Sequence, residues 1–279
     1  MLILLSAIFG ILVGILLNRA ADNLPPPHRR SLLESPHCPK CDTPRTPLEQ
    51  FGILSLVLRR TTCHNCNAPL GLRAPIVEIV TGVLFAFLSA RYSFSLYLII
   101  IWLFTALLIL ITVIDLEHKL ILSVVVIPAT LLAFLFSPLV YAGVNFTFET
   151  IRWNDYILAL LGAVFGYVVT LIFYWFGIFF VRLVNRNRRS KINTVAFGFG
   201  DVRLGGFLGA LIGFPAIFYA LIYAVLLGGI GALAAILLRT LQHGRYSAFT
   251  AIPYGPYLVI SGWAFLVFKP ELMARLLGT

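Results

Sequence analysis

Charged residues are scarce in this chain of 279 residues, and that scarcity excludes most soluble folds. Asp, Glu, Lys and Arg make up only 11% of the sequence, whereas hydrophobic residues make up 60% and the mean hydropathy is +0.96. A soluble domain could not keep so much apolar surface out of water. The composition therefore predicts a polytopic membrane protein.

Several familiar arrangements of catalytic residues are missing as well. The sequence has no GxSxG nucleophile elbow, no HExxH zinc helix and no phosphate-binding P-loop. These absences argue against the serine, metalloprotease and nucleotide chemistries that such motifs support. The remaining candidates are a few carboxylates at the ends of apolar segments and four cysteines.

Apolar runs cover the chain except for one polar block at residues 19–75. A hydrocarbon core of about 30 Å needs roughly 20 apolar residues per helical span. The first run lacks the basic start and the cleavage site of a signal peptide, so we expect it to remain as a span. The pattern predicts an all-α fold with about eight transmembrane helices, at residues 1–18, 75–90, 94–114, 120–141, 156–181, 202–213, 216–238 and 252–268.

The distribution of lysine and arginine predicts the orientation, because cytoplasmic loops retain these residues. With the N-terminus outside, 17 of the 21 fall on the inner side and 4 outside, the latter being Arg91, Arg152, Lys269 and Arg275. The polar block is then cytoplasmic. The formal charge of +10 follows from the same bias and indicates contact with anionic membrane lipids; no nucleic-acid-binding motif accompanies it.

Two aspartates stand out at the margins of apolar segments. Asp115 ends the run ILITVID and Asp201 closes FGFGD, and the predicted topology puts both on the cytoplasmic side. A carboxylate at such a margin is costly and often functional, although either one alone could be a solvated helix end or an N-cap. Gly198 and Gly200 leave the backbone before Asp201 accessible to another chain, such as a peptide substrate.

Two carboxylates held together can hydrolyse a peptide bond without a covalent intermediate. One acts as base toward water, and the other, protonated, donates to the carbonyl oxygen or the leaving amine. Carboxylates about 3 Å apart cannot both ionise, so the pair shares a proton. The sequence leaves open which of Asp115 and Asp201 is the base.

The polar block contains Cys38-Pro-Lys-Cys41 and, after 21 residues, Cys63-His-Asn-Cys66. Paired CxxC motifs supply four thiolates at a spacing typical of a structural Zn²⁺ site. The alternative is two disulfides, which are uncommon in the reducing cytoplasm. His37 and His64 lie beside the cysteines and are alternative ligands, although solvation in a loop explains each of them more simply.

Several motifs now match one family from end to end. They are Gly14, Leu17 and Asn18 in the first span, the double CxxC block, Pro75-Ile-Val-Glu78, Ile114-Asp115, the GFGD of residues 198–201, and Ile252-Pro-Tyr-Gly-Pro256. The chain resembles the type IV prepilin peptidases, which are bacterial GxGD aspartic membrane proteases. The resemblance makes residues 76–279 the transmembrane peptidase core and 19–75 a cytoplasmic double-CxxC domain.

This resemblance implies an activity, partners and a location. Asp115 and Asp201 would be catalytic, supported by Gly198, Gly200, Glu78 and Arg203, in a multi-pass protein of the cell inner membrane. The substrates would be prepilins or type II secretion pseudopilins, cut after a glycine that follows a short basic leader. Many members also methylate the new N-terminus with S-adenosylmethionine, and the double CxxC block is similar to that of such bifunctional members.

The sequence departs from the family pattern at three places. The common Pro-Asp pair after the first aspartate reads Leu122-Ser123, and the common lysine after the second aspartate is Arg203. The Asn-Ile-Pro of the polar block reads Gln50-Phe51-Gly52, while Ser55 is retained. The catalytic aspartates are intact, so peptidase activity is the better supported of the two activities.

Other interpretations remain open from the sequence. Glu78 either orients a substrate amine or pairs with Arg73, and Glu117 and His118 either tune Asp115 or form a hydrated turn. Gly205, Gly206 and Gly209 are expected to let helices approach closely. Rival functions are a proton-coupled transporter, a scaffold with inactive aspartates, and a GxGD peptidase that lacks methylation or acts on other leader-bearing membrane proteins.

Overall fold

The computed structural model describes residues 1–26, 30–32, 34–38, 40–59, 61–143, 147, 151–186, 197–243 and 253–277. It divides into two compact units, Met1–His118 and Lys119–Thr279. The described residues form helices and no β-strand, with six helices long and apolar enough to cross a membrane. The expected all-α, multi-pass membrane fold is confirmed. The expected number of eight is approximate, because two of the predicted spans correspond to shorter helices.

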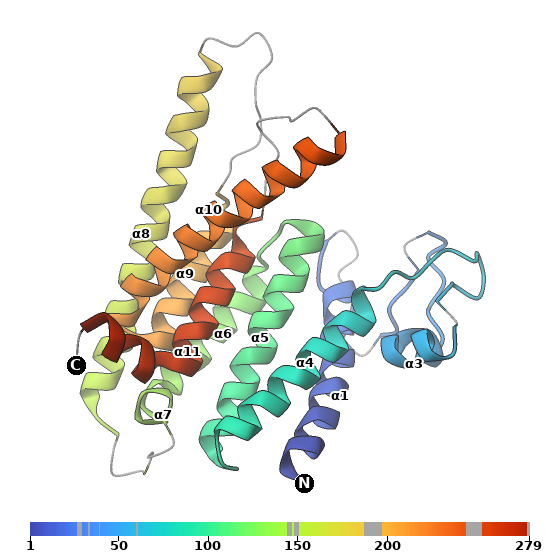
Figure 1. Cartoon of the computed structure of the whole chain (residues 1–279), viewed down its shortest axis with the longest axis horizontal. Helices are drawn as coiled ribbons and strands as arrows, with labels where there is room; N and C mark the ends of the chain where they lie inside the picture. Colours follow the sequence, from blue (N-terminus) through green and yellow to red (C-terminus); the bar gives the residue numbers. More distant parts are fainter. Residues whose placement is uncertain are drawn as a thin grey trace. The chain divides into compact units, whose positions relative to one another are not determined.

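Unit 1 is built on α1 (Leu2–Asn23), α4 (Arg73–Arg91) and α5 (Leu96–His118), which Figure 1 shows side by side. Between α1 and α4 lies the cysteine block, residues 24–72, with the short helices α2 (Pro47–Gln50) and α3 (Gly52–Val57). Helices α1 and α4 pack closely because a Cβ at Gly14 would lie 2.7 Å from the Cα atom of Glu78.

Helix α1 continues five residues beyond the predicted end of the first span, through Asn23. Polar side chains of its last turn form hydrogen bonds with residues of the cysteine block, so the helix can continue beyond the end of the apolar run. The Asn23 side chain donates hydrogen bonds to the carbonyl oxygens of Ser31 and Glu34, at 3.0 and 2.8 Å. This end of α1 therefore forms part of the base on which the block rests.

Unit 2 contains the remaining helices. They are α6 (Ser123–Leu135), α7 (Ser137–Ala142), α8 (Trp153–Asn185), α9 (Phe199–Ile212), α10 (Ala216–His243) and α11 (Gly255–Leu277). Helix α9 is buried along almost its whole length, with α6, α8 and α11 packed against it. It packs most extensively on α8, where Gly162 faces Gly209 and Gly166 faces Gly205. The expected close approach is confirmed at Gly205 and Gly209. It is wrong at Gly206, where a Cβ would make only ordinary contact, 3.5 Å from the Tyr167 side chain.

Proline explains where two predicted spans deviate from single helices. The span predicted at 120–141 breaks at Phe136, just before Ser137-Pro138. In α11 the backbone is non-helical at Phe268, two residues before Pro270, whose ring cannot continue the hydrogen-bond ladder. Part of the basic run at 182–191 and Ile252 of the IPYGP motif lie outside the described residues.

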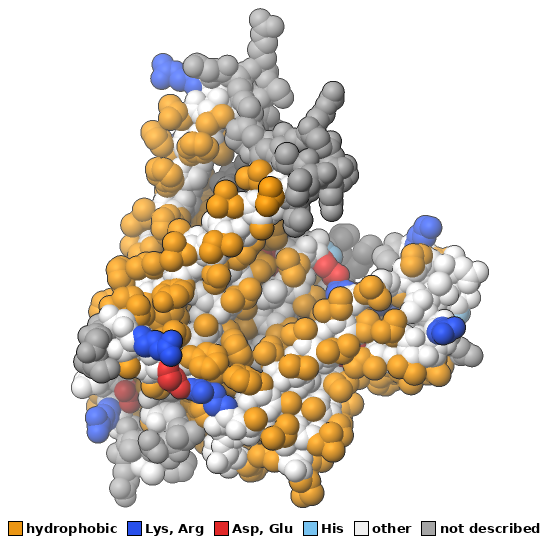
Figure 2. Space-filling model, in the orientation of Figure 1, with side chains coloured by type: hydrophobic (Ala, Val, Ile, Leu, Met, Phe, Trp, Pro, Cys, Tyr) orange, Lys and Arg blue, Asp and Glu red, His pale blue; other side chains and the backbone are white. Residues whose placement is uncertain are grey.

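The outer faces of the long helices are apolar. In Figure 2 hydrophobic side chains cover the visible faces of α4 and of α10. Exposed hydrophobic residues of these two helices include Val83 and Phe87 on α4, and Leu226 and Leu233 on α10. Apolar surface of this extent requires lipid around it, in agreement with the multi-pass assignment.

Candidate active site and four-cysteine cluster

Asp115 lies in the last turn of α5 and is the last buried residue of that helix. Its exposed fraction is 5%, whereas Leu116, Glu117 and His118 are all exposed. Helix α5 is mostly apolar from Leu96 to Ile114, and most of these residues are buried in unit 1. The apolar helix thus carries a single buried carboxylate to the point where its sequence turns polar.

Asp201 lies in the first turn of α9, with an exposed fraction of 6%. One of its carboxylate oxygens accepts a hydrogen bond of 2.9 Å from the backbone N–H of Gly198. A negative charge is favoured at this position because the helix dipole is positive at its N-terminus. The N-cap residue of α9 is Gly198, and Asp201 is the third helical residue, whose carboxylate reaches back to the backbone of that N-cap. The suggestion that Asp201 is itself an N-cap is therefore wrong.

The two glycines before Asp201 have different roles. A Cβ at Gly200 would lie 2.8 Å from the Cβ atom of Ile121, so this position must be small for the chain to pack. Gly198 has φ −87°, and a Cβ there would meet nothing closer than the Asp201 carboxylate at 3.6 Å. Packing against Ile121 therefore requires a glycine at position 200. The described residues leave space beside Gly198.

Arg203 and Ser123, two of the positions that depart from the family pattern, are in direct contact. The Nη1 atom of Arg203 donates a hydrogen bond to the Oγ atom of Ser123 at the start of α6. The guanidinium also lies over the ring of Phe199, with its Cζ atom 5.0 Å from the ring centroid. Arg203 therefore links α9 to α6 two residues after Asp201.

Tyr254 is a residue near Asp201 to which the sequence gave no individual role. Its ring packs on Phe197 with centroids 5.3 Å apart, just before α11 begins. Burial, and then the negative charge of Asp201, raise the pKa of Tyr254 to about 12. The phenol remains a neutral hydrogen-bond donor. Its place in the IPYGP motif was the signal that pointed to this position.

The four cysteines converge in the cysteine block. The Sγ atoms of Cys38 and Cys66 are 3.7 Å apart, those of Cys41 and Cys63 are 3.8 Å apart, and all four lie within 4.8 Å of one another. Thiolates bound tetrahedrally at about 2.3 Å from one ion would be about 3.8 Å apart. The four cysteines lie close enough to bind a metal ion, and they form no disulfide.

The two CxxC segments have the same backbone geometry. In each, the first cysteine donates to a carbonyl five residues on and accepts from the amide four residues on, all at 2.9 Å. Asp42 and Asn67, which follow the second cysteines, have φ of 53° and 54°, in the left-handed region that Asp and Asn tolerate best. The shared pattern CxxC-(Asp/Asn)-x-Pro in residues 38–44 and 63–69 would have predicted this repeat.

Thr43 favours the ionised form of Cys41. The Thr43 hydroxyl lies 2.8 Å from the Cys41 sulfur, and hydrogen bonding from Thr43 lowers the pKa of Cys41 to about 6. The thiolate is the form that binds a metal ion.

Glu49 joins the two CxxC segments. Its buried carboxylate accepts hydrogen bonds of 2.7 Å from the backbone N–H of Thr46, after the first segment, and of His64, within the second. Burial alone would raise the pKa of Glu49, but these hydrogen bonds outweigh it and lower the pKa below its usual value. The His64 ring also lies 3.1 Å from the same carboxylate. His64 is thereby engaged with Glu49 and needs no metal to explain its place.

Glu78 holds the cysteine block onto α4. Its two carboxylate oxygens accept hydrogen bonds from the backbone N–H groups of Gly52 and Ile53, at 2.6 and 2.8 Å. The suggested pairing of Glu78 with Arg73 is wrong, because the Arg73 guanidinium binds Asp22 and Glu117 instead. Both oxygens of Glu78 are used at the N-terminus of α3, where a carboxylate is favoured.

These features define a multi-pass membrane protein with a buried carboxylate at one helix end in each unit and a four-cysteine cluster in unit 1. Comparison with known sequences gives the family. The family model described as "Bacterial Peptidase A24 N-terminal domain" matches residues 8–92, and that of the "Type IV leader peptidase family" matches residues 102–233. No solved structure matches the chain significantly.

Curated relatives extend the match. A protein of Aeromonas hydrophila is 30% identical over 237 residues, covering 84% of this chain and 72% of the relative. One of Pseudomonas aeruginosa is 26% identical over 97% of this chain and 91% of the relative, and one of Bacillus subtilis is 27% identical over 89% and 87%. All three are named prepilin leader peptidase/N-methyltransferase. The chain belongs to the type IV leader peptidase family and is a membrane peptidase.

Proposed function

We propose that this peptidase removes the short basic leader of type IV prepilins or type II secretion pseudopilins, cutting after glycine at the cytoplasmic face of the inner membrane. The support is a buried carboxylate at a helix end in each unit, Asp115 in the last turn of α5 and Asp201 in the first turn of α9. The lysine and arginine bias assigns both ends to the cytoplasm. A leader that is basic and precedes a hydrophobic helix would present its cleavage site at that level.

In the proposed mechanism Asp115 and Asp201 form one catalytic pair. One carboxylate takes a proton from water, and the other donates a proton to the carbonyl oxygen and then to the leaving amine. The hydrogen bond from Gly198 to Asp201 orients one carboxylate. The space beside Gly198 gives an extended peptide a place to approach the chain. The aspartates belong to different units, and their pairing is part of the proposal.

We further propose that the four cysteines bind a structural Zn²⁺ ion. Sulfur distances of 3.7 and 3.8 Å match the tetrahedral expectation of about 3.8 Å. Metal analysis of the purified protein should give one zinc per chain, and Cys63→Ser should lose it. His64→Ala is the matched control, since its ring binds Glu49, and it should keep the metal. Loss of zinc in the His64 variant would instead make that histidine a ligand.

A second activity, N-methylation of the new N-terminus, is proposed from the names of the relatives and from the double CxxC block, which resembles that of bifunctional members of the family. Bound S-adenosylmethionine would supply the methyl group. The protein would contribute a site for that donor and hold the new amine near it.

The proposal is tested with a peptide made of a basic leader, a glycine and an apolar helix, incubated with purified protein in detergent. Asp115→Ala and Asp201→Ala should each abolish cleavage, at least a thousandfold below the wild type, because neither carboxylate can act alone. Asp42→Ala is a control, as that exposed carboxylate lies in the cysteine block. A product heavier by one methyl group after addition of S-adenosylmethionine would establish the second activity. Cleavage that survives either aspartate change would reject the mechanism and favour the transporter or scaffold reading.

A further inference from the structure

Helices α6 and α8 of unit 2 both pack on α9 but make few contacts with each other, and a groove of about 420 Å³ lies between them. Side chains between residues 126 and 131 of α6, between 163 and 168 of α8, and between 203 and 207 of α9 line it. Sites that hold small molecules commonly measure about 300–1,000 Å³. Neither the proposed cleavage nor the proposed zinc site uses this groove.

The groove is apolar except for one charged side chain. Val126 and Phe207 line it and are fully buried, whereas Leu131 on its rim is exposed. The Thr130 hydroxyl donates a hydrogen bond of 2.8 Å to the carbonyl oxygen of Val126, within α6. Arg203 is the one charged residue in the lining. The groove therefore suits a hydrocarbon chain that carries an anion at one end.

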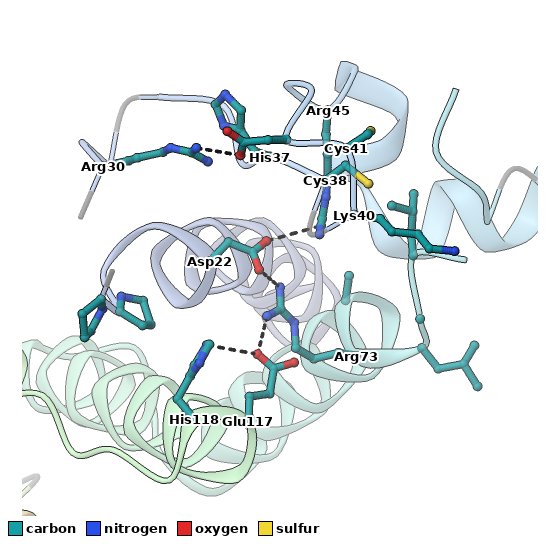
Figure 3. Close-up of a pocket in the computed structure, with 17 residues that line it drawn as sticks. Asp22, Arg30, His37, Cys38, Lys40, Cys41, Arg45, Arg73, Glu117 and His118 are labelled. Atoms are coloured by element: carbon teal, nitrogen blue, oxygen red, sulfur yellow. Dashed lines mark hydrogen bonds and ion pairs between the residues drawn. The ribbon is translucent and has the colours of Figure 1, made fainter. Parts of the chain in front are cut away.

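Arg203 differs from the arginines of the larger cavity in unit 1, which measures about 930 Å³ and is drawn in Figure 3. There Arg45 and Arg73 each bind a carboxylate, at 3.3 and 2.7 Å. Among the residues that the structure describes, Arg203 pairs with the Ser123 hydroxyl and the Phe199 ring and with no carboxylate. An arginine within a membrane helix is costly unless an anion pairs with it. The groove therefore holds a cation that still needs its anion.

The charge lies at one end of the groove. Arg203 is near the start of α9, the end that the lysine and arginine bias assigns to the cytoplasm, and the other lining residues of α9 follow it. On α6, Ser123 binds Arg203 and precedes all the lining residues of that helix. A phospholipid of the inner leaflet has the same polarity, with its charged head at the cytoplasmic surface and its chains pointing inward. That leaflet is also the anionic one.

Two observations argue against the apolar helix of a substrate as the occupant. Arg203 follows Asp201 by two residues, which puts their side chains about 200° apart around α9. The groove therefore lies on a different face of α9 from the peptidase carboxylate. A helix with its side chains is about 10–12 Å across, so a single turn takes up about 400–600 Å³, as much as the whole groove. An acyl chain is much thinner than a helix.

We propose that the groove between α6 and α8 binds an anionic phospholipid of the inner leaflet, with an acyl chain along the groove and the phosphate on the Arg203 guanidinium. Arg203 is partly exposed and lines the groove, so a headgroup at its cytoplasmic end can reach the side chain. A guanidinium can bind two phosphate oxygens side by side. The lipid supplies the anion that the neutral Ser123 hydroxyl does not.

Native mass spectrometry of the full-length protein, delipidated in a nonionic detergent, tests the site with short-chain lipids. Dioctanoyl phosphatidylglycerol is the anionic probe, and dioctanoyl phosphatidylcholine has the same chains and no net charge. The wild type should bind phosphatidylglycerol roughly tenfold more tightly or better, because it alone brings a net negative charge to Arg203. Inorganic phosphate should not displace the lipid, since phosphate has no chain for the groove.

Three variants separate the headgroup contact from the chain contact. Arg203→Met should remove the preference for phosphatidylglycerol and leave the weaker binding of phosphatidylcholine unchanged. Ser123→Asp keeps the guanidinium but gives it a carboxylate, so it should reduce the preference as well. Ala163→Leu should weaken binding of both lipids, because the larger side chain fills the groove. The matched controls are Arg182→Met in the last turn of α8 and Ala234→Leu on α10, both exposed and outside the groove, and both should bind like the wild type.

Thermal unfolding of each variant shows whether it is folded. The inference is wrong if the wild type binds the two lipids equally, or if Arg203→Met and Ser123→Asp both keep the preference. It is also wrong if Arg182→Met removes the preference, or if inorganic phosphate displaces the lipid, which would indicate a bare anion site. Displacement of the lipid by the leader-bearing peptide would assign the groove to the substrate instead. Leader cleavage is measured separately, so none of these outcomes decides the proposed function.

Discussion

The cysteine block of unit 1 and helix α9 of unit 2 are held in place by different means. In unit 1 polar side chains tie the elements together: the carboxylate of Glu78 binds the N-terminus of α3, and Asn18 donates to the carbonyl of Ala74 at 3.0 Å. In unit 2 the helix of Asp201 is held chiefly by backbone contact, with glycines of α8 and α9 facing one another. The attachment of the cysteine block should be sensitive to changes of charge and hydrogen bonding, and the contact between α8 and α9 to changes of size.

The difference follows from the surroundings of each contact. The cysteine block is polar, and its backbone groups need partners that side chains such as Glu49 and Glu78 provide. Between α8 and α9 there is no water to expel by burying larger side chains, so close packing of small residues supplies the attraction. Side-chain hydrogen bonds therefore hold the cysteine block, and close packing of glycines holds α8 against α9.

The largest effect should come from adding one methyl group in unit 2. A Cβ at Gly209 would overlap the backbone carbonyl of Gly162, and backbone cannot move aside as a side chain can. Gly209→Ala should therefore destabilise the protein by about 1–3 kcal/mol in denaturant titration in mixed micelles. Gly229→Ala on α10 is the matched control, since a Cβ there meets nothing within 4 Å. Equal stability of the two variants would remove the contrast between the units.

The sequence predicted the fold class and the approximate positions of the long apolar helices, because apolar runs are strong local signals in membrane proteins. It did not predict the short helices α2, α3 and α7. It could not predict that α1 continues to Asn23, since the partners of that turn lie in the cysteine block. It also could not predict the break at Phe136, where a serine–proline step interrupts a run that is apolar on both sides.

For a similar reason, the sequence predicted some residues of the candidate site and missed the roles of others. Cys38, Cys41, Cys63 and Cys66 carry a local spacing signal, and the structure brings them together. The role of Glu78 depends on Gly52 and Ile53, 26 and 25 residues away, and no local pattern reports such a contact. Side-chain roles that depend on distant partners need coordinates, whereas ligand motifs do not.

A smaller effect is expected from the carboxylate that joins the two CxxC segments. Glu49→Gln replaces hydrogen bonds to a charged acceptor with weaker neutral ones and should cost about 1–2 kcal/mol at neutral pH. Because folding lowers the pKa of Glu49, its contribution is complete above the unfolded value of about 4.3 and is lost as pH falls through the folded value. Hydrogen exchange of the backbone amides of Thr46 and His64 measures both the loss of stability and its dependence on pH.

The difference between wild type and Glu49→Gln should therefore shrink as the pH is lowered below about 4. Glu34→Gln is the control, because that side chain is exposed, and it should match the wild type throughout. If the stability difference between wild type and Glu49→Gln stays constant or widens as the pH falls, the charge of Glu49 does not stabilise the block.

The smallest effect should appear at the one polar link between α6 and α9 that involves Arg203. Ser123→Asp would replace a neutral acceptor by a carboxylate facing the guanidinium, restoring the acid that the resemblance leads us to expect at this position. The new ion pair is partly buried, so a gain of about 0.5–1 kcal/mol is expected. A double-mutant cycle with Arg203→Met isolates it, since the gain should vanish without the guanidinium. If Ser123→Asp has the same effect with and without Arg203, the two departures from the family pattern are independent of each other.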